Sequence, residues 1–310
     1  MSTLRPGLSV RTSVPATSAN LGPGFDSLGI ALGVRDECEA TVTEQAGLRI
    51  EVEGEGAGEV PLHEGHLVHR AMRSAWDELG QGPPAGLHLR CRNAVPHGRG
   101  MGSSATAIVT GIVAAQALSR MAEGTSGLVD LDWCNDLAAR LEGHPDNSSA
   151  AVYGGVTLSW SDDPAGGTST LRLAPHPDLD PVVLVPATQL STATARAVLP
   201  AQVSLADAAA NSARAALLVH ALTQAPEHLL DGTREWLHQE ARRPAYPASM
   251  ALVDRLRAEG HAAVISGAGP SVVVLGVAGQ VQSVRTLAGE RWRALTPGVP
   301  AVGSRVERLG

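Results

Sequence analysis

The chain has 310 residues, 44% of them hydrophobic and 18% charged, and its formal net charge at pH 7 is −7. These values exclude a disordered chain and are typical of a globular protein with one large domain or two smaller ones. The acidic balance argues against nucleic acid as a partner, and we expect no signal peptide, membrane span or membrane partner. A reducing, cytoplasmic location is favoured by an odd number of isolated cysteines, Cys38, Cys91 and Cys134.

The first third of the chain is predicted to contain three strands and one helix. Alternating apolar residues predict strands at 8–14, 30–43 and 48–52, and apolar residues at helical spacing predict a helix at 67–79. Histidines recur at every third position around the start of this helix, at His63, His66 and His69. The spacing resembles a ladder of metal ligands, but no carboxylate or cysteine accompanies it, so we do not predict a metal site there.

The loop between the first two strands, residues 15–29, is dense in small residues, hydroxyls and glycines. Asn20 and Asp26 are its side chains best equipped to hold a small polar ligand. Both residue types also bond to their own backbone in turns, so a purely structural role fits the sequence equally well.

Residues 96–105 read Pro-His-Gly-Arg-Gly-Met-Gly-Ser-Ser-Ala and lie between a predicted strand at 87–95 and a predicted helix at 105–121. Three glycines at alternate positions leave backbone N–H groups free to converge on one anion, and two serine hydroxyls follow them. The start of a helix also favours negative charge. The segment is therefore predicted to be a phosphate cradle; a glycine-rich connection that binds nothing is the alternative.

Two better-known phosphate-binding motifs fit the cradle less well. A P-loop needs a lysine, and the chain contains none. The dinucleotide fingerprint matches literally at residues 100–105, but Pro96 precedes the turn and two serines crowd its tip, where a pyrophosphate needs bare backbone. Hydroxyl oxygens are hard ligands for a hard cation, so the serines favour a nucleoside triphosphate with Mg²⁺.

Residues 131–141 are predicted to form a helix that ends in a short polar turn. The turn brings together acid, base and amide side chains, at Glu142, His144, Asp146 and Asn147. Such a cluster suits chemistry, although Gly143 and Pro145 would also serve to stop a helix. A strand is expected at 150–160, and residues 161–170 form the best domain boundary.

The second half of the chain is predicted to alternate strands and helices around a second glycine-rich turn, Ser266–Ser271. Alternation and helical spacing place strands at 182–185, 262–265, 272–277 and near 302–306, and helices at 205–222, 249–259 and 280–292.

The two glycine-rich segments resemble motifs of the GHMP kinases, and the resemblance covers nearly the whole chain. Residues 96–105 look like the family's ATP-binding motif, Pro-x-x-x-Gly-Leu-Gly-Ser-Ser-Ala, with Met101 in place of leucine. Residues 266–271 look like its third motif. Within the family, the chain is most similar to the homoserine kinases, in the segments 15–29, 142–147, 191–200 and, more loosely, 238–247.

The resemblance implies an α/β (α+β) protein with the GHMP kinase fold. Residues 1–165 would form a ribosomal-S5-domain-2-like domain with a four- or five-stranded sheet, and residues 166–310 a ferredoxin-like domain. ATP and substrate are expected between the two, and a homodimer is compatible with the resemblance.

The resemblance also implies an enzyme that uses ATP and Mg²⁺ to phosphorylate the side-chain hydroxyl of L-homoserine, in threonine biosynthesis. Departures from the homoserine kinase pattern at residues 148–149 and 239–241 keep another hydroxy amino acid, such as threonine or a secondary-metabolite precursor, open as the substrate. A GHMP-fold ligand sensor is a further alternative, against which the retained Glu142 and both cradle serines argue.

The site residues are carried over from the matching motifs. ATP is assigned to Arg92, Pro96, Gly98, Arg99, Gly100, Met101, Gly102, Ser103, Ser104, Ala105, Gly267 and Gly269, and the metal to Ser103 or Ser104 with Glu142. The substrate carboxylate is assigned to Arg196 and Arg242, its ammonium to Asp26 with His144, and its hydroxyl to Asn20 with Asn147 and Thr192. The residues expected to carry catalysis are Asn20, Glu142, Asn147 and Arg196; no obligate base is expected, because phosphoryl transfer depends mainly on positioning and charge neutralisation.

Overall fold

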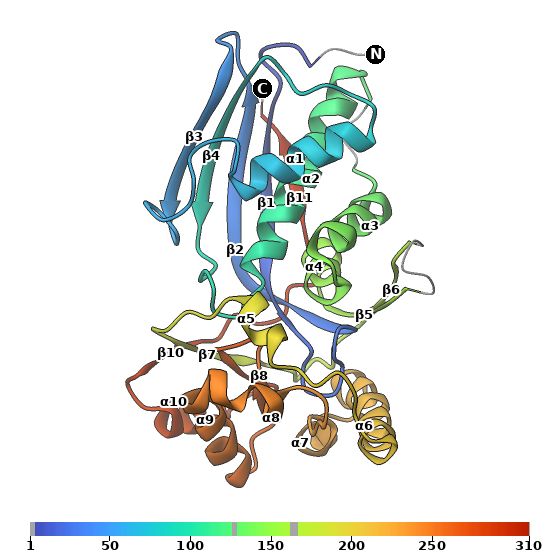
Figure 1. Ribbon diagram of the computed structural model, residues 1–310, viewed down its shortest axis with the longest axis vertical. Helices are drawn as coiled ribbons and strands as arrows, with labels where there is room; N and C mark the ends of the chain where they lie inside the picture. The colour runs from blue at the N-terminus through green and yellow to red at the C-terminus, as the bar shows by residue number, and fades with distance from the viewer. Residues whose placement is uncertain (1–3, 126–128, 162–166, 310) are drawn as a thin grey trace.

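The computed structural model describes residues 4–125, 129–161 and 167–309, and all of Thr192 except its side chain. Figure 1 shows two sheets, each covered by helices, with the short helix α5 (Thr192–Ala197) at the junction between them. This arrangement confirms the mixed α/β fold.

The first sheet contains seven strands in the described part of the chain. Its main path runs β11-β1-β2-β4-β3, and β5 extends from β2 to pair with β6. The strands are β1 (Ser9–Ala19), β2 (Leu28–Val42), β3 (Gly47–Gly54), β4 (Gly86–Asn93), β5 (Val156–Trp160), β6 (Ser169–Leu173) and β11 (Arg305–Arg308). The expectation of four or five strands was too low, because β6 and β11 come from the second half of the chain.

Four helices cover one face of this sheet: α1 (Leu67–Glu78), α2 (Ser103–Ala122), α3 (Leu131–Glu142) and α4 (Pro145–Tyr153). Helix α2 lies at the centre of the hydrophobic core that they form with the sheet. By length and composition alone α2 could span a membrane, although no membrane span was predicted from the sequence. However, 83% of its most apolar window is buried inside the protein. That burial is typical of a core helix.

The second sheet is antiparallel throughout, with the order β10-β7-β9-β8. Its strands are β7 (Val182–Pro186), β8 (Ala263–Ile265), β9 (Val272–Val274) and β10 (Trp292–Leu295). The helices of this half are α6 (Leu205–Thr223), α7 (Leu229–Gly232), α8 (Gln239–Arg242), α9 (Pro247–Ala258) and α10 (Val281–Ala288). One hydrophobic cluster joins the two halves, because Ile30 and Met101 from the first belong to it together with Val183 and Val264 from the second.

Several predicted boundaries were wrong. Residues 150–153, predicted as the start of a strand, belong to α4, because Pro145 begins a new helix after α3 and Gly154, with φ 77°, ends it. The helix predicted at 280–292 ends at Ala288, and Trp292 begins β10. The predicted division between residues 165 and 166 lies outside the described residues.

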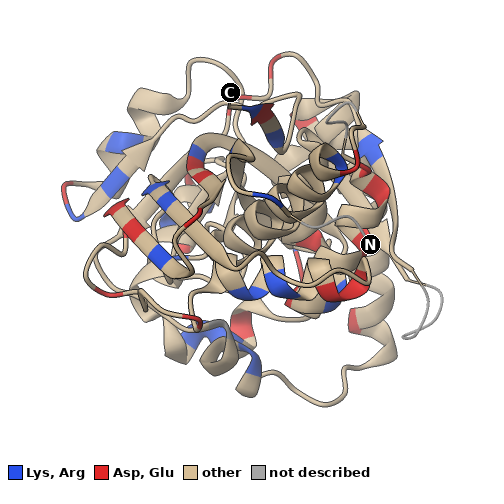
Figure 2. Cartoon of the chain, turned by 90° about the horizontal axis from the view of Figure 1, so that it is seen from above, with Lys and Arg blue, Asp and Glu red and all other residues tan. Residues whose placement is uncertain are grey.

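Figure 2 shows that acidic and basic residues are scattered along the helices, strands and loops, with both signs interspersed. Since the chain contains no lysine, every blue segment there is an arginine.

Candidate active site

Three loops that are far apart in the sequence meet between the two sheets. The hydroxyl of Ser266 donates a hydrogen bond to the carbonyl oxygen of Gly100 over 2.6 Å and lies 2.8 Å from the hydroxyl of Ser18. The amide of Gly267 donates to the carbonyl oxygen of Ala19. The cradle, the second glycine-rich turn and the N-terminal loop are thus bonded directly to one another.

The cradle takes its shape from left-handed glycines. Gly98, Gly100 and Gly102 have φ values of 62°, 71° and 69°, which side chains with a Cβ rarely adopt. Gly102 is the N-cap of α2 and leaves the first amides of that helix without a side-chain cap. Ser103 and Ser104, which begin α2, line the same cleft as the three glycines, so the cradle has the form of an anion site at a helix N-terminus.

Most of the predicted site residues line a single cleft. We call it the central cleft, and the cradle forms part of its wall. These site residues are Asn20, Gly98, Gly100, Gly102, Ser103, Ser104, Glu142, His144, Asn147, Arg196, Arg242, Gly267 and Gly269. Asp26 joins this group through an ion pair with Arg196, described below.

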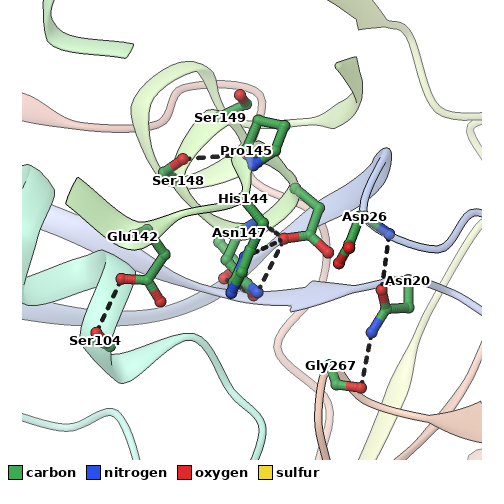
Figure 3. A network of polar contacts seen from close by, with 12 residues as sticks. Asn20, Asp26, Ser104, Glu142, His144, Pro145, Asn147, Ser148, Ser149 and Gly267 are labelled. Atoms are coloured by element: carbon green, nitrogen blue, oxygen red, sulfur yellow. Dashed lines mark hydrogen bonds and ion pairs between the residues drawn. The ribbon is translucent and has the colours of Figure 1, made fainter. Parts of the chain in front are cut away.

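Glu142 reaches the start of α2 from the end of α3. The hydroxyl of Ser104 donates a 2.9 Å hydrogen bond to Glu142 Oε2 (Figure 3). Burial raises the pKa of the Glu142 carboxyl, a penalty that the Ser104 hydrogen bond reduces. A partly buried carboxylate beside two hydroxyls offers hard oxygen ligands, so these residues fit a divalent cation such as Mg²⁺.

Asp146 organises the polar turn at the start of α4. Its Oδ1 atom accepts hydrogen bonds from the Asn147 amide at 2.8 Å and from the Asn147 side chain at 3.3 Å, and lies 3.0 Å from His144 Nδ1 (Figure 3). Burial alone would lower the pKa of His144, but the hydrogen bond and charge of Asp146 raise it above its ordinary value. Asn147 Oδ1 accepts a 2.8 Å hydrogen bond from the Thr17 hydroxyl. Asp146 was named as part of the polar turn, but no role in the site was predicted for it from the sequence.

Asn20 holds the N-terminal loop in an unusual conformation. It has a left-handed φ of 66°, as has Asp26 at 55°. Asn20 Oδ1 accepts the Asp26 amide at 3.0 Å, and its Nδ2 donates to the Gly267 carbonyl oxygen at 2.9 Å (Figure 3). These bonds give Asn20 the structural role expected of such a residue in a loop, and its side chain also lines the central cleft, where the ligand-binding role stays a prediction.

Arg196 and Asp26 form a bidentate ion pair. Arg196 Nη2 lies 2.6 Å from Asp26 Oδ1, and Nη1 lies 3.2 Å from Oδ2. Both side chains keep about a third of their surface exposed, at 36% and 34%. The charges are opposite and adjacent, and Arg196 lines the central cleft, so an anion lies directly beside a cation of the cleft wall.

Arg242 is buried beneath this pair. Its guanidinium donates to the carbonyl oxygen of Ala195 at 2.9 Å and lies 3.2 Å from His238 Nδ1. Phe25 stacks on His238 and has the guanidinium carbon of Arg242 5.6 Å from its ring centroid, within cation–π range. Arg242 therefore both lines the cleft and anchors α5, which carries Arg196.

Two predicted arginines do not reach the cleft. Arg92 lies on β4 next to the buried Cys91, so strand alternation turns it to the outer face of the sheet, where it lies 3.7 Å from Glu53. The guanidinium of Arg99 donates to the carbonyl oxygens of Pro186 and Ala187 at the end of β7. The assignment of Arg92 to the phosphates is thus wrong, and the Arg99 side chain ties the cradle to the second sheet.

The remaining predicted residues contribute backbone or lie elsewhere. Met101 and Ala105 are buried, with their side chains in the protein interior. Pro96 lines a separate hollow with Arg99. Thr192 begins α5, but its side chain lies outside the described part of the structure.

A second cavity, of about 260 Å³, opens on the other side of Ser103 and Ser104; we call it the side cavity. Its walls are largely apolar and include Val60, Pro61, Val68 and Ala107, with His66 and Asp36 among its polar residues. It was not predicted from the sequence, because His97 of the cradle lines it together with residues of β2, the loop before α1, α1, β4 and α2, and no single contiguous motif marks it.

Comparisons with known proteins agree with this geometry. Residues 66–155 match the model of the GHMP kinases N terminal domain, and residues 213–287 match that of the GHMP kinases C terminal domain. The chain is 50% identical to the homoserine kinases of Streptomyces avermitilis and Streptomyces coelicolor, over 96% of its length and 95% and 94% of theirs. A crystal structure of homoserine kinase from Cytophaga hutchinsonii superposes with a TM-score of 0.83 at 24% identity, covering 96% of this chain and 97% of that one. The chain therefore belongs to the GHMP kinases and, within that family, to the homoserine kinases.

Proposed function

We propose that the chain transfers the γ-phosphoryl group of ATP to the side-chain hydroxyl of L-homoserine, giving O-phospho-L-homoserine and ADP in threonine biosynthesis. One observation carries the proposal: Arg196 lines the same cleft as the phosphate cradle and is paired with Asp26, so a cation and an anion lie side by side there. An amino acid brings one carboxylate and one ammonium, and this pair offers a partner for each within reach of a bound phosphate.

The nucleotide occupies the cradle and the side cavity in this proposal. The free amides from Gly98 to Ser104 hold the triphosphate, and the nucleoside lies in the side cavity, because Ser103 and Ser104 border both spaces. Its apolar walls suit a flat heterocycle.

Ser103 or Ser104 and Glu142 would hold Mg²⁺. The bound cation supplies neutralisation of the phosphate charge. Burial of the Glu142 carboxylate supports this assignment, since a cation offsets the penalty that raises its pKa.

The amino acid is held by groups of three kinds. Arg196 and Arg242 bind the carboxylate, Asp26 with His144 binds the ammonium, and Asn20 with Asn147 and Thr192 orients the hydroxyl. Asn20 and Asn147 are each held by a hydrogen bond to a residue of another segment. This fixed arrangement supports catalysis by alignment of the attacking oxygen.

We also place the enzyme in the cytoplasm. Cys38 and Cys91 lie on paired strands with their sulfur atoms 3.6 Å apart, yet both are free thiols. In a reducing compartment such as the cytoplasm, two thiols this close stay unlinked.

Arg196→Leu tests the amino-acid site. We expect the KM for homoserine to rise by roughly ten- to a hundredfold, because a charge-assisted contact worth about 1.5–3 kcal/mol is lost, while the KM for ATP stays unchanged. Phosphorylation of 3-aminopropan-1-ol, which lacks the carboxylate, should be poor in the unmodified enzyme and fall little further in the variant. A coupled ADP-release assay measures all three quantities.

Arg243→Leu is the matched control, since Arg243 is a neighbouring arginine whose partners are the exposed Glu240 and Asp254. It should leave homoserine kinetics unchanged. Arg242→Leu should also raise the KM for homoserine. Its thermal unfolding is measured as well, because the Ala195 carbonyl oxygen loses its hydrogen-bond donor in this variant. An unchanged homoserine KM in Arg196→Leu, or a preference of the unmodified enzyme for threonine, would overturn the proposed substrate.

A further inference from the structure

Phe25 is the only phenylalanine in the chain, and its ring lies among polar and charged side chains. The residue is half-buried, yet it belongs to none of the three hydrophobic clusters of the described structure. Its ring stacks instead on the imidazole of His238, with the ring centroids 5.0 Å apart and an angle of 25° between the ring planes. A place in a hydrophobic core therefore does not explain why a phenylalanine stands here.

Two guanidinium groups lie within reach of this one ring. The guanidinium carbon of Arg196 lies 5.8 Å from the ring centroid of Phe25, and that of Arg242 lies 5.6 Å from it. At both distances the negative face of an aromatic ring attracts a cation. The two arginines line the central cleft and come from different helices, α5 and α8. The ring is therefore shared by the two cations that are assigned to the substrate carboxylate.

The two arginines differ in how their charge is compensated. Arg196 has Asp26 as an ion-pair partner, whereas Arg242 bonds to the Ala195 carbonyl oxygen and lies beside His238, and neither of these groups is an anion. Burial lowers the pKa of the Arg242 guanidinium, and the charge of Arg196 lowers it further. A buried cation is costly unless another group compensates its charge. The electron-rich face of Phe25 is such a group.

His238 joins the ring to Arg242 without adding positive charge. Burial lowers the pKa of His238, so its imidazole is neutral at pH 7. Its Nε2 atom lies 2.9 Å from the Gly22 carbonyl oxygen, which can only accept a hydrogen bond, so Nε2 carries the proton. Nδ1 then accepts a hydrogen bond from the Arg242 guanidinium at 3.2 Å. The aromatic ring and the guanidinium are thus both held by one neutral imidazole.

We propose that Phe25 is a positioning residue, whose ring holds the guanidiniums of Arg196 and Arg242 close enough together to bind one carboxylate. The two like charges repel each other before the substrate arrives, and the ring attracts both of them. The inference rests on the proposed function in one respect, the assignment of the substrate carboxylate to these two arginines. Phe25 acts through the arginines and does not touch the reacting atoms.

The single phenylalanine makes a direct test possible. A phenylalanine-requiring expression host, supplied with phenylalanine that carries one, two or three ring fluorine atoms, exchanges this ring alone. Each fluorine withdraws electrons from the ring face and weakens its attraction for a cation, while the shape of the ring changes little. We expect the KM for homoserine to rise in steps, to about fivefold with the trifluorinated ring. The KM for ATP should stay unchanged, and kcat should stay within about twofold.

Two further measurements separate positioning from a general loosening of the site. The kcat/KM for 3-aminopropan-1-ol, which lacks the carboxylate, should not change along the fluorinated series, because this substrate gains nothing from the two arginines. Phe25→Leu keeps an apolar side chain but removes the ring face. It should raise the KM for homoserine by about tenfold, more than the trifluorinated ring does, and a thermal melt checks its fold.

An unchanged KM for homoserine across the fluorinated series overturns the inference whether or not Phe25→Leu folds, since a ring that only fills space still does so when it carries fluorine. A matching rise in the KM for ATP also overturns it. So does an equal loss with 3-aminopropan-1-ol, because either result indicates a general distortion of the central cleft.

These outcomes are separable from a failure of the proposed function. Homoserine kinetics that respond to Arg196→Leu but not to fluorination would overturn only the inference. A preference of the unmodified enzyme for threonine would overturn only the proposed substrate. The fluorinated series is then measured with threonine, which carries the same carboxylate, and a stepwise rise in its KM would support the role of Phe25.

Discussion

Glu142→Gln is expected to lower kcat for homoserine phosphorylation by about a hundredfold or more, because a neutral amide is a poor ligand for a hard divalent cation. The fold should be kept, since the amide oxygen can still accept the Ser104 hydrogen bond. Burial raises the pKa of Glu142, so its ionised form is less stable in the folded protein than in the unfolded one. The melting temperature at pH 7 should therefore not fall. Steady-state kinetics over a range of Mg²⁺ concentrations and a thermal melt check the two parts.

Asp132→Asn serves as the control on the same helix. Its carboxylate accepts a 2.6 Å hydrogen bond from the Tyr153 hydroxyl, away from the central cleft. We expect kcat to stay within about twofold. A near-normal kcat of Glu142→Gln at ordinary Mg²⁺ concentration would remove Glu142 from the metal site.

Gly100→Val is expected to abolish nucleotide binding. Gly100 has a φ of 71°, where a β-branched residue is strongly disfavoured, and a Cβ there would collide with the Ser266 carbonyl oxygen and lie 2.8 Å from that of Gly269. The obstruction is the backbone of the second glycine-rich turn, so the two loops would be forced apart. Calorimetry with ATP and with ADP measures the loss.

Gly98→Ala separates backbone strain from this collision. Its φ of 62° is also left-handed, but the nearest atom to a Cβ there is Gln189 Cβ, at an ordinary 3.4 Å. We expect a stability loss of about 1 kcal/mol with nucleotide affinity within a few-fold of normal. Normal ATP binding by a folded Gly100→Val protein would show that residues 96–105 are not the nucleotide cradle.

The parts of the site predicted from the sequence are those carried by contiguous residues. Alternate glycines followed by two serines define a cradle locally, because left-handed backbone and free amides are properties of neighbouring residues. Helix α3 and the turn after it were predicted for the same reason. The resemblance to the family's motifs led to the further prediction that loops far apart in the sequence form one site.

The features that were not predicted depend on which distant segments a residue packs or pairs with in the folded chain. Arg92 precedes the cradle in the sequence, yet the strand period turns it to the opposite face of the sheet. The side cavity is lined by segments that lie far apart in the sequence, and His66 Nδ1 is buried without a hydrogen-bond partner among the described residues only because α1 packs as it does. Strand β6 begins inside the stretch predicted as a domain boundary, since its partner β5 rather than its own pattern decides its structure.

The return of β11 to β1 has a consequence for synthesis of the protein. Val10 pairs with Arg308, so one edge of the first sheet is formed by residues at opposite ends of the chain. During synthesis β1 emerges from the ribosome before the other strands of this sheet, and β11 emerges after all of them. The backbone donors and acceptors on that side of β1 stay unpaired until β11 has been made, and an open strand edge is a template for association between chains. The first half of the chain is therefore most prone to aggregate before β11 has been made. Once β11 pairs with β1, that side of β1 is covered.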